Sequence, residues 1–179
     1  MYNERLMIFI DGENLFKCAR DENIKIDYSK LISLLSTNFN LIRVYYYTGI
    51  PTMGSWDKQK ETEKEFKIKL GKQINFLDKL ALDYNFHIIT RPLVLDKGIV
   101  KEKGIDVNIA SDIIWRGLSN NYDAFILLSG DRDLIECLER MKDNGKRVII
   151  ANFEGKISRE IKKIADKYIN LSAFKYEIS

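Results

Sequence analysis

Short apolar runs separated by amphipathic stretches are the main pattern along this chain. Five runs are rich in β-branched and aromatic residues, and each ends at turn-forming residues, which is typical of β-strands. They cover residues 6–10, 41–47, 86–90, 124–129 and 147–152. The runs are continuously apolar instead of alternating with polar residues, as expected for strands that are buried on both faces. The pattern therefore predicts five strands inside the molecule.

The segments between the runs have apolar residues at helical spacing. Helices are predicted over residues 14–21, 27–38, 57–84, 106–118, 132–144 and 157–167. Residues 91–104 are too broken for a helix and are expected to form a small β-excursion that turns at residues 96–98. Residues 169–174 are a candidate for one more edge strand. Because strands alternate with helices, we expect one three-layer α/β domain over residues 1–179, with a central, mainly parallel five-stranded sheet and helices on both faces.

The composition places the chain among ordinary folded proteins, with 45% hydrophobic and 31% charged residues. A net charge of +3 permits a nucleic-acid partner but does not argue for one. Cys18 and Cys137 form no CxxC pair, so two reduced thiols are expected, as in a reducing compartment. The N-terminal apolar run, residues 6–10, is too short for a signal peptide or a membrane span. We therefore expect a cytoplasmic protein that does not contact membranes.

Aspartates stand at the ends of predicted elements. Asp11 directly follows the first strand, and Asp131 and Asp133 follow the fourth. In a doubly wound sheet, ligands bind beyond the carboxyl ends of the strands, where the strand order reverses. If the first and fourth strands are neighbours, these carboxylates meet on one rim. Asp106 begins a predicted helix, in phase with the apolar Ile109, so its side chain faces inward and needs a partner.

Each aspartate has an ordinary alternative role when it is considered alone. Asp11 could belong to a turn, Asp131 could cap a helix, and Asp133 could compensate a helix dipole. Together, however, several neighbouring carboxylates cannot all stay ionised without a cation. Oxygen ligands with a single histidine in the chain favour Mg²⁺ or Mn²⁺ over Zn²⁺. Asp112 lies in another helical phase, where an ion pair with Arg116 explains it as well as a role at the site does.

Three segments carry a resemblance to a known family. They are IDGENLF (10–16), KGIDVNIASDII (103–114) and YDAFILLSGDRDLIECLERMKDNGKRVIIA (122–151). In order and spacing they resemble the NYN domain (LabA-like) family of the PIN-like nuclease superfold, over nearly the whole chain. The resemblance implies a five-stranded parallel sheet with an acidic metal site used for ribonuclease activity. The family's acidic positions fall on Asp11, Asp106, Asp131 and Asp133, Asn14 is a supporting polar group, Asp112 matches a recurring acid, and Glu13 occupies a variable position.

The resulting expectation is a metal-dependent endoribonuclease that hydrolyses RNA phosphodiester bonds. The catalytic set is Asp11, Asn14, Asp106, Asp131 and Asp133, and its four aspartates are the expected ligands of Mg²⁺ or Mn²⁺. Because RNA phosphates are repelled by acids, basic residues must flank the site. We expect Lys101, Lys103 and Arg132 to bind substrate, with Arg91 as a further candidate. The lysines of the 57–84 helix alternate with glutamates and favour a solvated face. Tyr47 favours core packing over base stacking, while Trp56 stays undecided between stacking a base and anchoring the helix.

Other functions are also compatible with these residues. The main alternative is a catalytically weak regulator of the same fold that binds RNA or a protein. A DNA nuclease of this superfold is less favoured because no helical-arch insertion is present. A phosphatase or receiver domain is disfavoured because no lysine follows a later strand-end Thr or Ser. No nucleotide cofactor is expected, and the sequence leaves a homodimer open.

Overall fold

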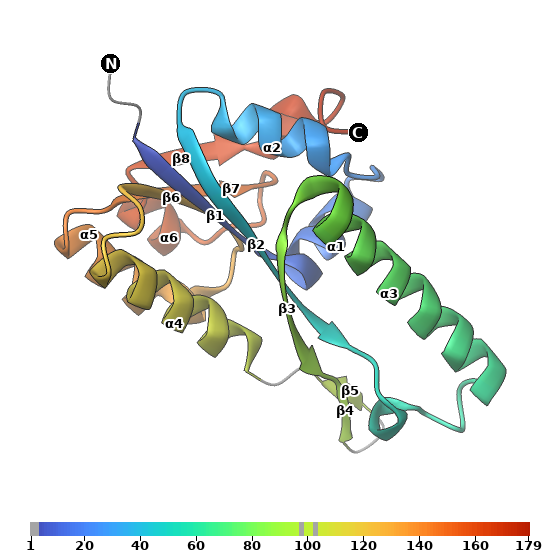
Figure 1. Ribbon diagram of the computed structural model, residues 1–179. Helices are drawn as coiled ribbons and strands as arrows, with labels where there is room; N and C mark the ends of the chain where they lie inside the picture. Colours follow the sequence, from blue (N-terminus) through green and yellow to red (C-terminus); the bar gives the residue numbers. More distant parts are fainter. Residues whose placement is uncertain (1–3, 97–98, 102–103) are drawn as a thin grey trace.

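A parallel sheet with helices on both faces forms the body of the protein (Figure 1). The computed structural model describes residues 4–96, 99–101 and 104–179. The sheet has six strands in the order β3-β2-β1-β6-β7-β8, all paired in parallel. These strands are β1 (Arg5–Asp11), β2 (Asn40–Ile50), β3 (His87–Pro92), β6 (Ala124–Leu128), β7 (Arg147–Asn152) and β8 (Lys167–Asn170).

The fold class is confirmed, with one strand more than the five expected. The additional strand is β8, which overlaps the segment considered as an edge strand. β8 is short and its four residues are exposed or half-buried, so it lacks the continuous apolar run that marks the other strands. The β-excursion also forms, as the antiparallel hairpin β4 (Val94–Asp96) and β5 (Ile99–Lys101). Its expected turn lies partly outside the described residues.

The strand order reverses between β1 and β6. From β1 the chain moves outward through β2 to β3, then returns to the other side of β1 and moves outward through β6, β7 and β8. β1 and β6 pair directly, with Ile10 beside Leu128. The condition for the convergence of Asp11 with the acids after β6 is therefore met. The crevice at the carboxyl ends of these two strands is where ligands bind in folds of this type.

Helices cover the two faces of the sheet and enclose separate cores. The helices are α1 (Gly12–Asp21), α2 (Tyr28–Ser36), α3 (Glu63–Tyr84), α4 (Ile105–Leu118), α5 (Ile135–Asp143) and α6 (Arg159–Ile164). The first three pack on one face and the last three on the other. The run Tyr45, Tyr46 and Tyr47 alternates between these cores, as the period of a strand requires. Tyr47 is fully buried, so core packing is confirmed for it and it is not exposed for base stacking.

The long helix α3 begins six residues later than predicted. Thr62 and Glu65 form a capping box: the N–H of Glu65 donates to Oγ1 of Thr62 (3.3 Å), and the N–H of Thr62 donates to Oε2 of Glu65 (2.8 Å). Before this cap, Nε1 of Trp56 donates to the carbonyl of Glu61 (3.1 Å), and the indole packs near Phe66. Trp56 therefore anchors the start of α3. Within the described residues, none of the helices is long and apolar enough to cross a membrane.

Candidate active site

Asp11 is the best-fixed acid at the carboxyl edge of the sheet. It ends β1 and caps α1, and the N–H of Asn14 donates to its Oδ1 (3.0 Å). The hydroxyl of Ser129, which follows β6, donates to its Oδ2 (3.1 Å). Gly12, which begins α1, lets the ring of Tyr46 pack against the chain here, because a Cβ would lie 2.5 Å from that ring. Both carboxylate oxygens of Asp11 are thus held in place at the β1–β6 crevice.

The surroundings of Asp11 disfavour its ionised form. The pKa of Asp11 is raised to about 6, mainly by burial and also by the negative charges of Asp106 and Glu13. The hydrogen bonds from Asn14 and Ser129 oppose part of this rise. A carboxyl group that is 7% exposed and is destabilised by neighbouring acids gains from a nearby cation.

Asp106 links Asp11 to the acids that follow β6. It lies in the first turn of α4 and is half-buried. Burial raises the pKa of Asp106, and the charges of Asp131 and Asp133 raise it further. Asp131 caps the short 3-10 helix Arg132–Leu134, because its Oδ1 accepts from the N–H of Asp133 (2.9 Å). Asp131 therefore has the capping role considered for it, and Asp11 caps α1 instead of belonging to a turn. The charges of Asp131 and Asp133 also act on Asp106.

These acids line an open rim instead of a closed cage. In the part of the chain that the structure describes, no three carboxylate, thiol or imidazole groups are arranged to hold a metal ion by themselves. Mg²⁺ keeps several of its waters and often binds through one or two carboxylates together with substrate phosphates. The donor set, carboxylate oxygens without imidazole or thiolate, fits such an ion. The arrangement therefore suits a weakly held Mg²⁺ or Mn²⁺ and does not suit a tightly bound structural metal.

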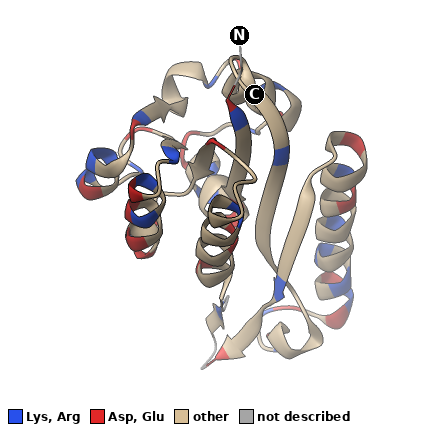
Figure 2. Ribbon diagram, turned by 60° about the vertical axis from the view of Figure 1, so that its left-hand side comes forward, with Lys and Arg blue, Asp and Glu red and all other residues tan. Residues whose placement is uncertain are grey.

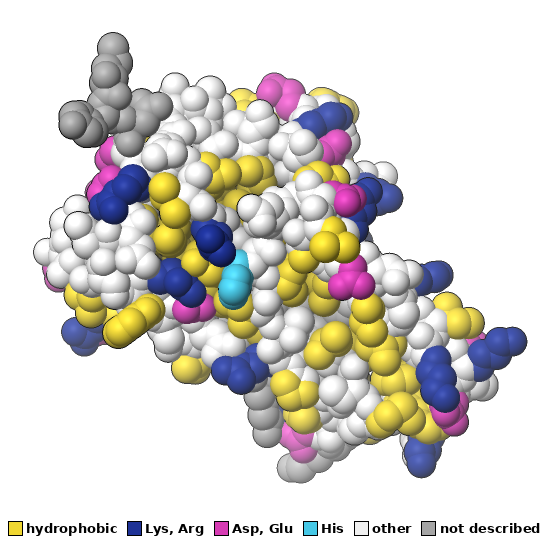
Figure 3. Space-filling model, in the orientation of Figure 1, with side chains coloured by type: hydrophobic (Ala, Val, Ile, Leu, Met, Phe, Trp, Pro, Cys, Tyr) yellow, Lys and Arg dark blue, Asp and Glu magenta, His cyan; other side chains and the backbone are white. Residues whose placement is uncertain are grey.

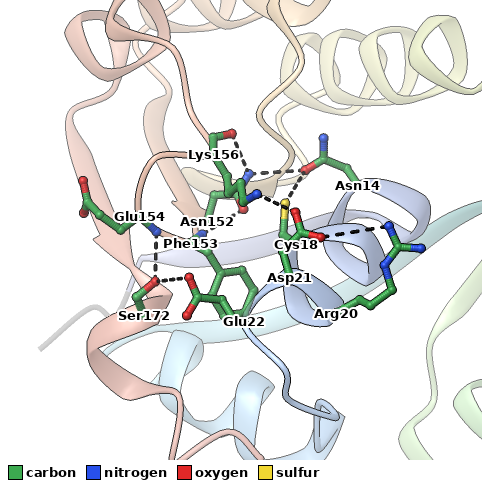
Figure 4. Close-up of polar contacts among 10 residues, drawn as sticks. All are labelled: Asn14, Cys18, Arg20, Asp21, Glu22, Asn152, Phe153, Glu154, Lys156 and Ser172. Atoms are coloured by element: carbon green, nitrogen blue, oxygen red, sulfur yellow. Dashed lines mark hydrogen bonds and ion pairs between the residues drawn. The ribbon is translucent and has the colours of Figure 1, made fainter.

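Asn14 belongs to a hydrogen-bond network behind the acids (Figure 4). Its Oδ1 accepts from the N–H of Gly130 (3.3 Å), Nδ2 of Asn152 (3.3 Å) and Sγ of Cys18 (3.7 Å). The orientation of the Asn152 amide is set by backbone groups, since its Oδ1 accepts from the N–H of Phe153 (2.8 Å) and its Nδ2 also donates to the carbonyl of Lys156 (3.4 Å). Because Oδ1 of Asn14 accepts all three of these bonds, the side-chain nitrogen of Asn14 points away from the network (Figure 4). Asn14 therefore offers hydrogen-bond donors and is a poor metal ligand.

Ser129 and Asn152 were not among the residues assigned from the sequence. Ser129 is fully buried and Asn152 is 1% exposed, and both contact residues of the site. Their only signal in the sequence is a polar residue at the end of an apolar run, AFILLS and RVIIAN. Gly130, which follows Ser129, packs so closely on the carbonyl of Lys156 that a Cβ would collide with it.

Asp112 has the ordinary role that was considered for it. Its Oδ1 accepts from Nη2 of Arg116 (3.2 Å), and its Oδ2 accepts from the hydroxyl of Tyr47 (2.9 Å). Asp112 lies six residues after Asp106, which places it about 120° around α4. It therefore contacts β2 and points in a different direction around α4 than Asp106 does.

Two of the expected substrate-binding residues take part in surface ion pairs. Lys101 contacts Asp96 (2.9 Å), and Arg132 contacts Glu160 (3.5 Å). Exposed pairs of this kind are weak and leave both cations able to meet a phosphate. Lys103 lies outside the described residues. On α3, lysines alternate with Asp and Glu along the helix (Figure 2), and pairs such as Lys67–Glu63 confirm the solvated face.

Comparisons with known proteins agree with this architecture. The NYN domain matches residues 5–172 of the chain. The protein named "Low amplitude and bright protein LabA" from Synechococcus elongatus is 23% identical over 170 residues, which cover 94% of this chain and 84% of that protein. A crystal structure of a protein of unknown function from Vibrio parahaemolyticus has a TM-score of 0.69 at 18% identity, and the match covers 95% of this chain and 94% of that one. That structure supports the fold, and the family match shows that the chain belongs to the NYN domain family.

Proposed function

We propose that this protein is a ribonuclease that depends on Mg²⁺ or Mn²⁺. The observation that carries the proposal is Asp11, a buried carboxyl held by two hydrogen bonds at the crevice between β1 and β6. Its pKa is raised to about 6, and Asp106 connects it electrostatically to Asp131 and Asp133. A perturbed acid at the point where the strand order reverses is a strong candidate for chemistry.

Membership of the NYN family supports the general class of this function. The NYN domain has the PIN-like nuclease fold, and such domains generally act on nucleic acids with divalent metals. The identity of the ion, the cleavage of RNA and the residues involved belong to the proposal. They rest on the chemistry of the acidic rim.

Each side chain has a role that follows from its position. Asp11, Asp106 and Asp131 would hold the ion, directly or through water, and the exposed Asp133 would hold a second ion or orient the attacking water. A bound divalent ion supplies charge neutralisation at the phosphate and activation of water. Ser129 and the N–H of Asn14 keep the Asp11 carboxylate in one orientation. The side-chain nitrogen of Asn14 would donate a hydrogen bond to a phosphate oxygen of the substrate.

Cleavage of an end-labelled single-stranded RNA tests the proposal. The wild type should cleave with Mn²⁺ or Mg²⁺ and stop when EDTA is added. Asp11→Asn and Asp131→Asn should each reduce the rate by at least ~100-fold, since even the partners of metal ligands typically contribute 10- to 100-fold. Asp78→Asn, which removes an exposed carboxylate on α3, should retain the wild-type rate. Cleavage that survives EDTA, or an Asp11→Asn protein of wild-type activity, would contradict the proposal.

A binding protein with little turnover is the second candidate function. The observation that favours it is the open rim, in which no three ligating groups among the described residues hold a cation by themselves. Under this alternative, RNA or a protein partner binds while cleavage stays undetectable even with enzyme in excess over RNA. A measurable single-turnover rate of RNA cleavage with Mn²⁺ would favour the ribonuclease over this alternative.

A further inference from the structure

The edge of the sheet beside α4 carries exposed basic side chains. α4 packs over β1 and β2, while β3 lies beyond it as the edge strand. In the β2–β3 register, His87 pairs with Tyr45 and Arg91 pairs with Gly49. Because side chains alternate along a strand, His87 and Arg91 point to the face that α4 occupies on the neighbouring strands. Both are exposed there.

Two more arginines gather around Tyr45 on the same face. The guanidinium carbon of Arg116 lies 4.2 Å from the centre of the Tyr45 ring, and the ring of His87 lies 5.3 Å from it. Arg43 precedes Tyr45 by two residues on β2, so it points the same way, and it is exposed. Figure 3 shows Lys and Arg side chains around the single histidine of the chain, which is cyan. We call Arg43, His87, Arg91 and Arg116 the arginine surface.

Part of the hydrogen-bonding capacity of this surface is unused. Arg116 donates from Nη2 to Asp112, but its Nε is buried without a hydrogen-bond partner. A guanidinium has five N–H donors, and a buried donor without a partner is destabilising. Arg91 donates to the neutral amide oxygen of Asn108 (2.7 Å), and no ion pair joins Arg91 or Arg43 to a carboxylate within the described residues. The surface therefore keeps a net positive charge, since Asp112 balances only Arg116.

Arginines next to an exposed aromatic side chain suit single-stranded nucleic acid. A planar guanidinium can bind a phosphate through two hydrogen bonds and can also stack on a base. Trp115, adjacent to Arg116, is 67% exposed and lies two helical turns after Asn108, which faces Arg91. Unpaired bases stack on such aromatic rings, whereas the bases of a duplex stack on one another.

The arginine surface also leads toward the acidic rim. From the level of Arg43 to the level of Gly49, which pairs with Arg91, the surface spans about 20 Å along β2. Asp11 pairs in register with Tyr47, two residues before Gly49. The Arg91 end of the surface therefore reaches the carboxyl edge of the sheet, where α4 begins and Asp11 and Asp106 lie.

We propose that the arginine surface binds the backbone of single-stranded RNA and guides the strand to the carboxylates. This inference rests on the proposed ribonuclease function, because it supplies the substrate path to the same site. It adds the substrate form, a single strand, and the residues that hold it. The negatively charged rim cannot itself attract RNA, so a separate cationic surface provides the attraction.

Binding of a fluorescent single-stranded RNA to the full-length protein tests the inference. Anisotropy is measured over a range of KCl concentrations in EDTA, so that cleavage does not interfere. Arg43→Gln and Arg91→Gln should each weaken binding by about 10-fold at low salt. Each should also reduce the slope of log affinity against log salt by about 0.7, the value for one lost phosphate contact on a single strand. Lys25→Gln is the control, because it removes one exposed charge between α1 and α2, on the other face.

The possible outcomes separate this inference from the proposed function. If the two arginine variants bind RNA like the control, the proposed role of the arginine surface is wrong, even when the wild type cleaves RNA. If the two variants lose RNA binding and the wild type does not cleave RNA with Mn²⁺, the RNA-binding role of the arginine surface is supported and the ribonuclease proposal fails. Equal affinity for duplex RNA overturns the assignment to single strands. Binding of an acidic peptide in place of RNA overturns the RNA assignment.

Discussion

At the scale of single residues, the orientation of the Asn14 amide depends on Asn152. Hydrogen bonds with backbone groups of Phe153 and Lys156 fix the orientation of the Asn152 side-chain amide. This amide donates in turn to Oδ1 of Asn14. The direction in which Asn14 presents its donors is therefore decided by a side chain at the end of a different strand. A change at Asn152 should act on catalysis through Asn14, without contact with the substrate.

Asn152→Asp should lower the catalytic rate by at least ~10-fold, with a smaller effect on KM. The substitution places an acceptor opposite Oδ1 of Asn14, so the amide should turn and withdraw its donors from the site. Asn152→Ala, which removes the donor without adding an acceptor, should lower the rate less. Urea unfolding should show that both variants lose about 1 to 3 kcal/mol, the effect of a buried group left without its partner. A wild-type rate for Asn152→Asp would refute this role.

Asp11 should make the stability of the metal-free protein depend on pH. The folded pKa of about 6 lies above the ordinary 3.8, so the neutral form is favoured by folding. Its contribution is fully present below about pH 4 and is lost as the pH rises through about 6. In EDTA, Asp11→Asn should therefore gain stability relative to the wild type on going from pH 4 to pH 7, by the order of 2 to 3 kcal/mol. Added Mn²⁺ should raise the Tm of the wild type and not that of the variant.

At the scale of elements, strands and helices followed from local patterns more readily than their boundaries did. Continuous apolar runs predicted five strands, but burial on both faces was wrong for β3, an edge strand whose residues are exposed or half-buried. β8 is too polar and too short to give the strand signal. The predicted helix over residues 57–84 begins only at Glu63. The sequence TEKE, with Thr62 and Glu65 three residues apart, is a capping-box signal that marks this start.

The capping box offers a test of how α3 is stabilised. Thr62→Ala should lower the free energy of unfolding by about 1 kcal/mol, because the N–H of Glu65 loses its acceptor. Thr62→Ser retains the hydroxyl and should keep most of the stability. RNA cleavage should be unchanged in both variants, since the cap lies away from the acidic rim. Chemical denaturation of the three proteins gives the comparison.

The candidate site was predictable only where local sequence marks it. Asp11 stands directly after an apolar run, and Asp131 and Asp133 follow the end of another run by two and four residues. The helical phase of Asp106 predicts that it faces inward. In contrast, the arginine surface joins β2, β3 and α4, whose cationic residues become neighbours only through strand pairing and helix packing. Ser129 and Asn152 likewise depend on which strands lie side by side. Long-range pairing of this kind leaves no pattern in a single sequence.

At the scale of the whole molecule, the two ends of the β1–β6 pair have opposite characters. At the amino end, Arg5 holds Asp123 with Nε and Nη2 (3.0 and 2.7 Å), and the backbone N–H of Arg5 adds a third bond (2.9 Å). The charges are matched there. At the carboxyl end, Asp11 meets other acids and lacks such compensation among the described residues. One end therefore stabilises the pairing of the strands, and the other is available for chemistry.

The Arg5–Asp123 pair should make the free energy of unfolding depend on pH in the acidic range. The hydrogen bonds and charge of Arg5 lower the pKa of Asp123 to about 2. Because the folded pKa lies below the unfolded value, the contribution is present above about pH 4 and is lost as the pH falls toward 2. Asp123→Asn should therefore destabilise the protein at neutral pH and approach the wild type at low pH. Identical differences in stability at pH 2 and pH 6 would contradict this assignment.

The hydrogen bond between Ser129 and Asp11 joins residues 118 positions apart in the chain. When a ribosome has synthesised β1 through β5, the nascent chain contains Asp11 and Asn14 but none of the other aspartates of the acidic rim. β6, which would pair with β1, has not yet been made. Contacts of such long range also form late, because a large loop must close first. The Asp11 carboxyl of a growing polypeptide therefore lacks its Ser129 partner until the second half of the chain has been made. If the protein is the ribonuclease proposed above, premature termination or early proteolytic cutting should yield fragments that cannot cleave RNA.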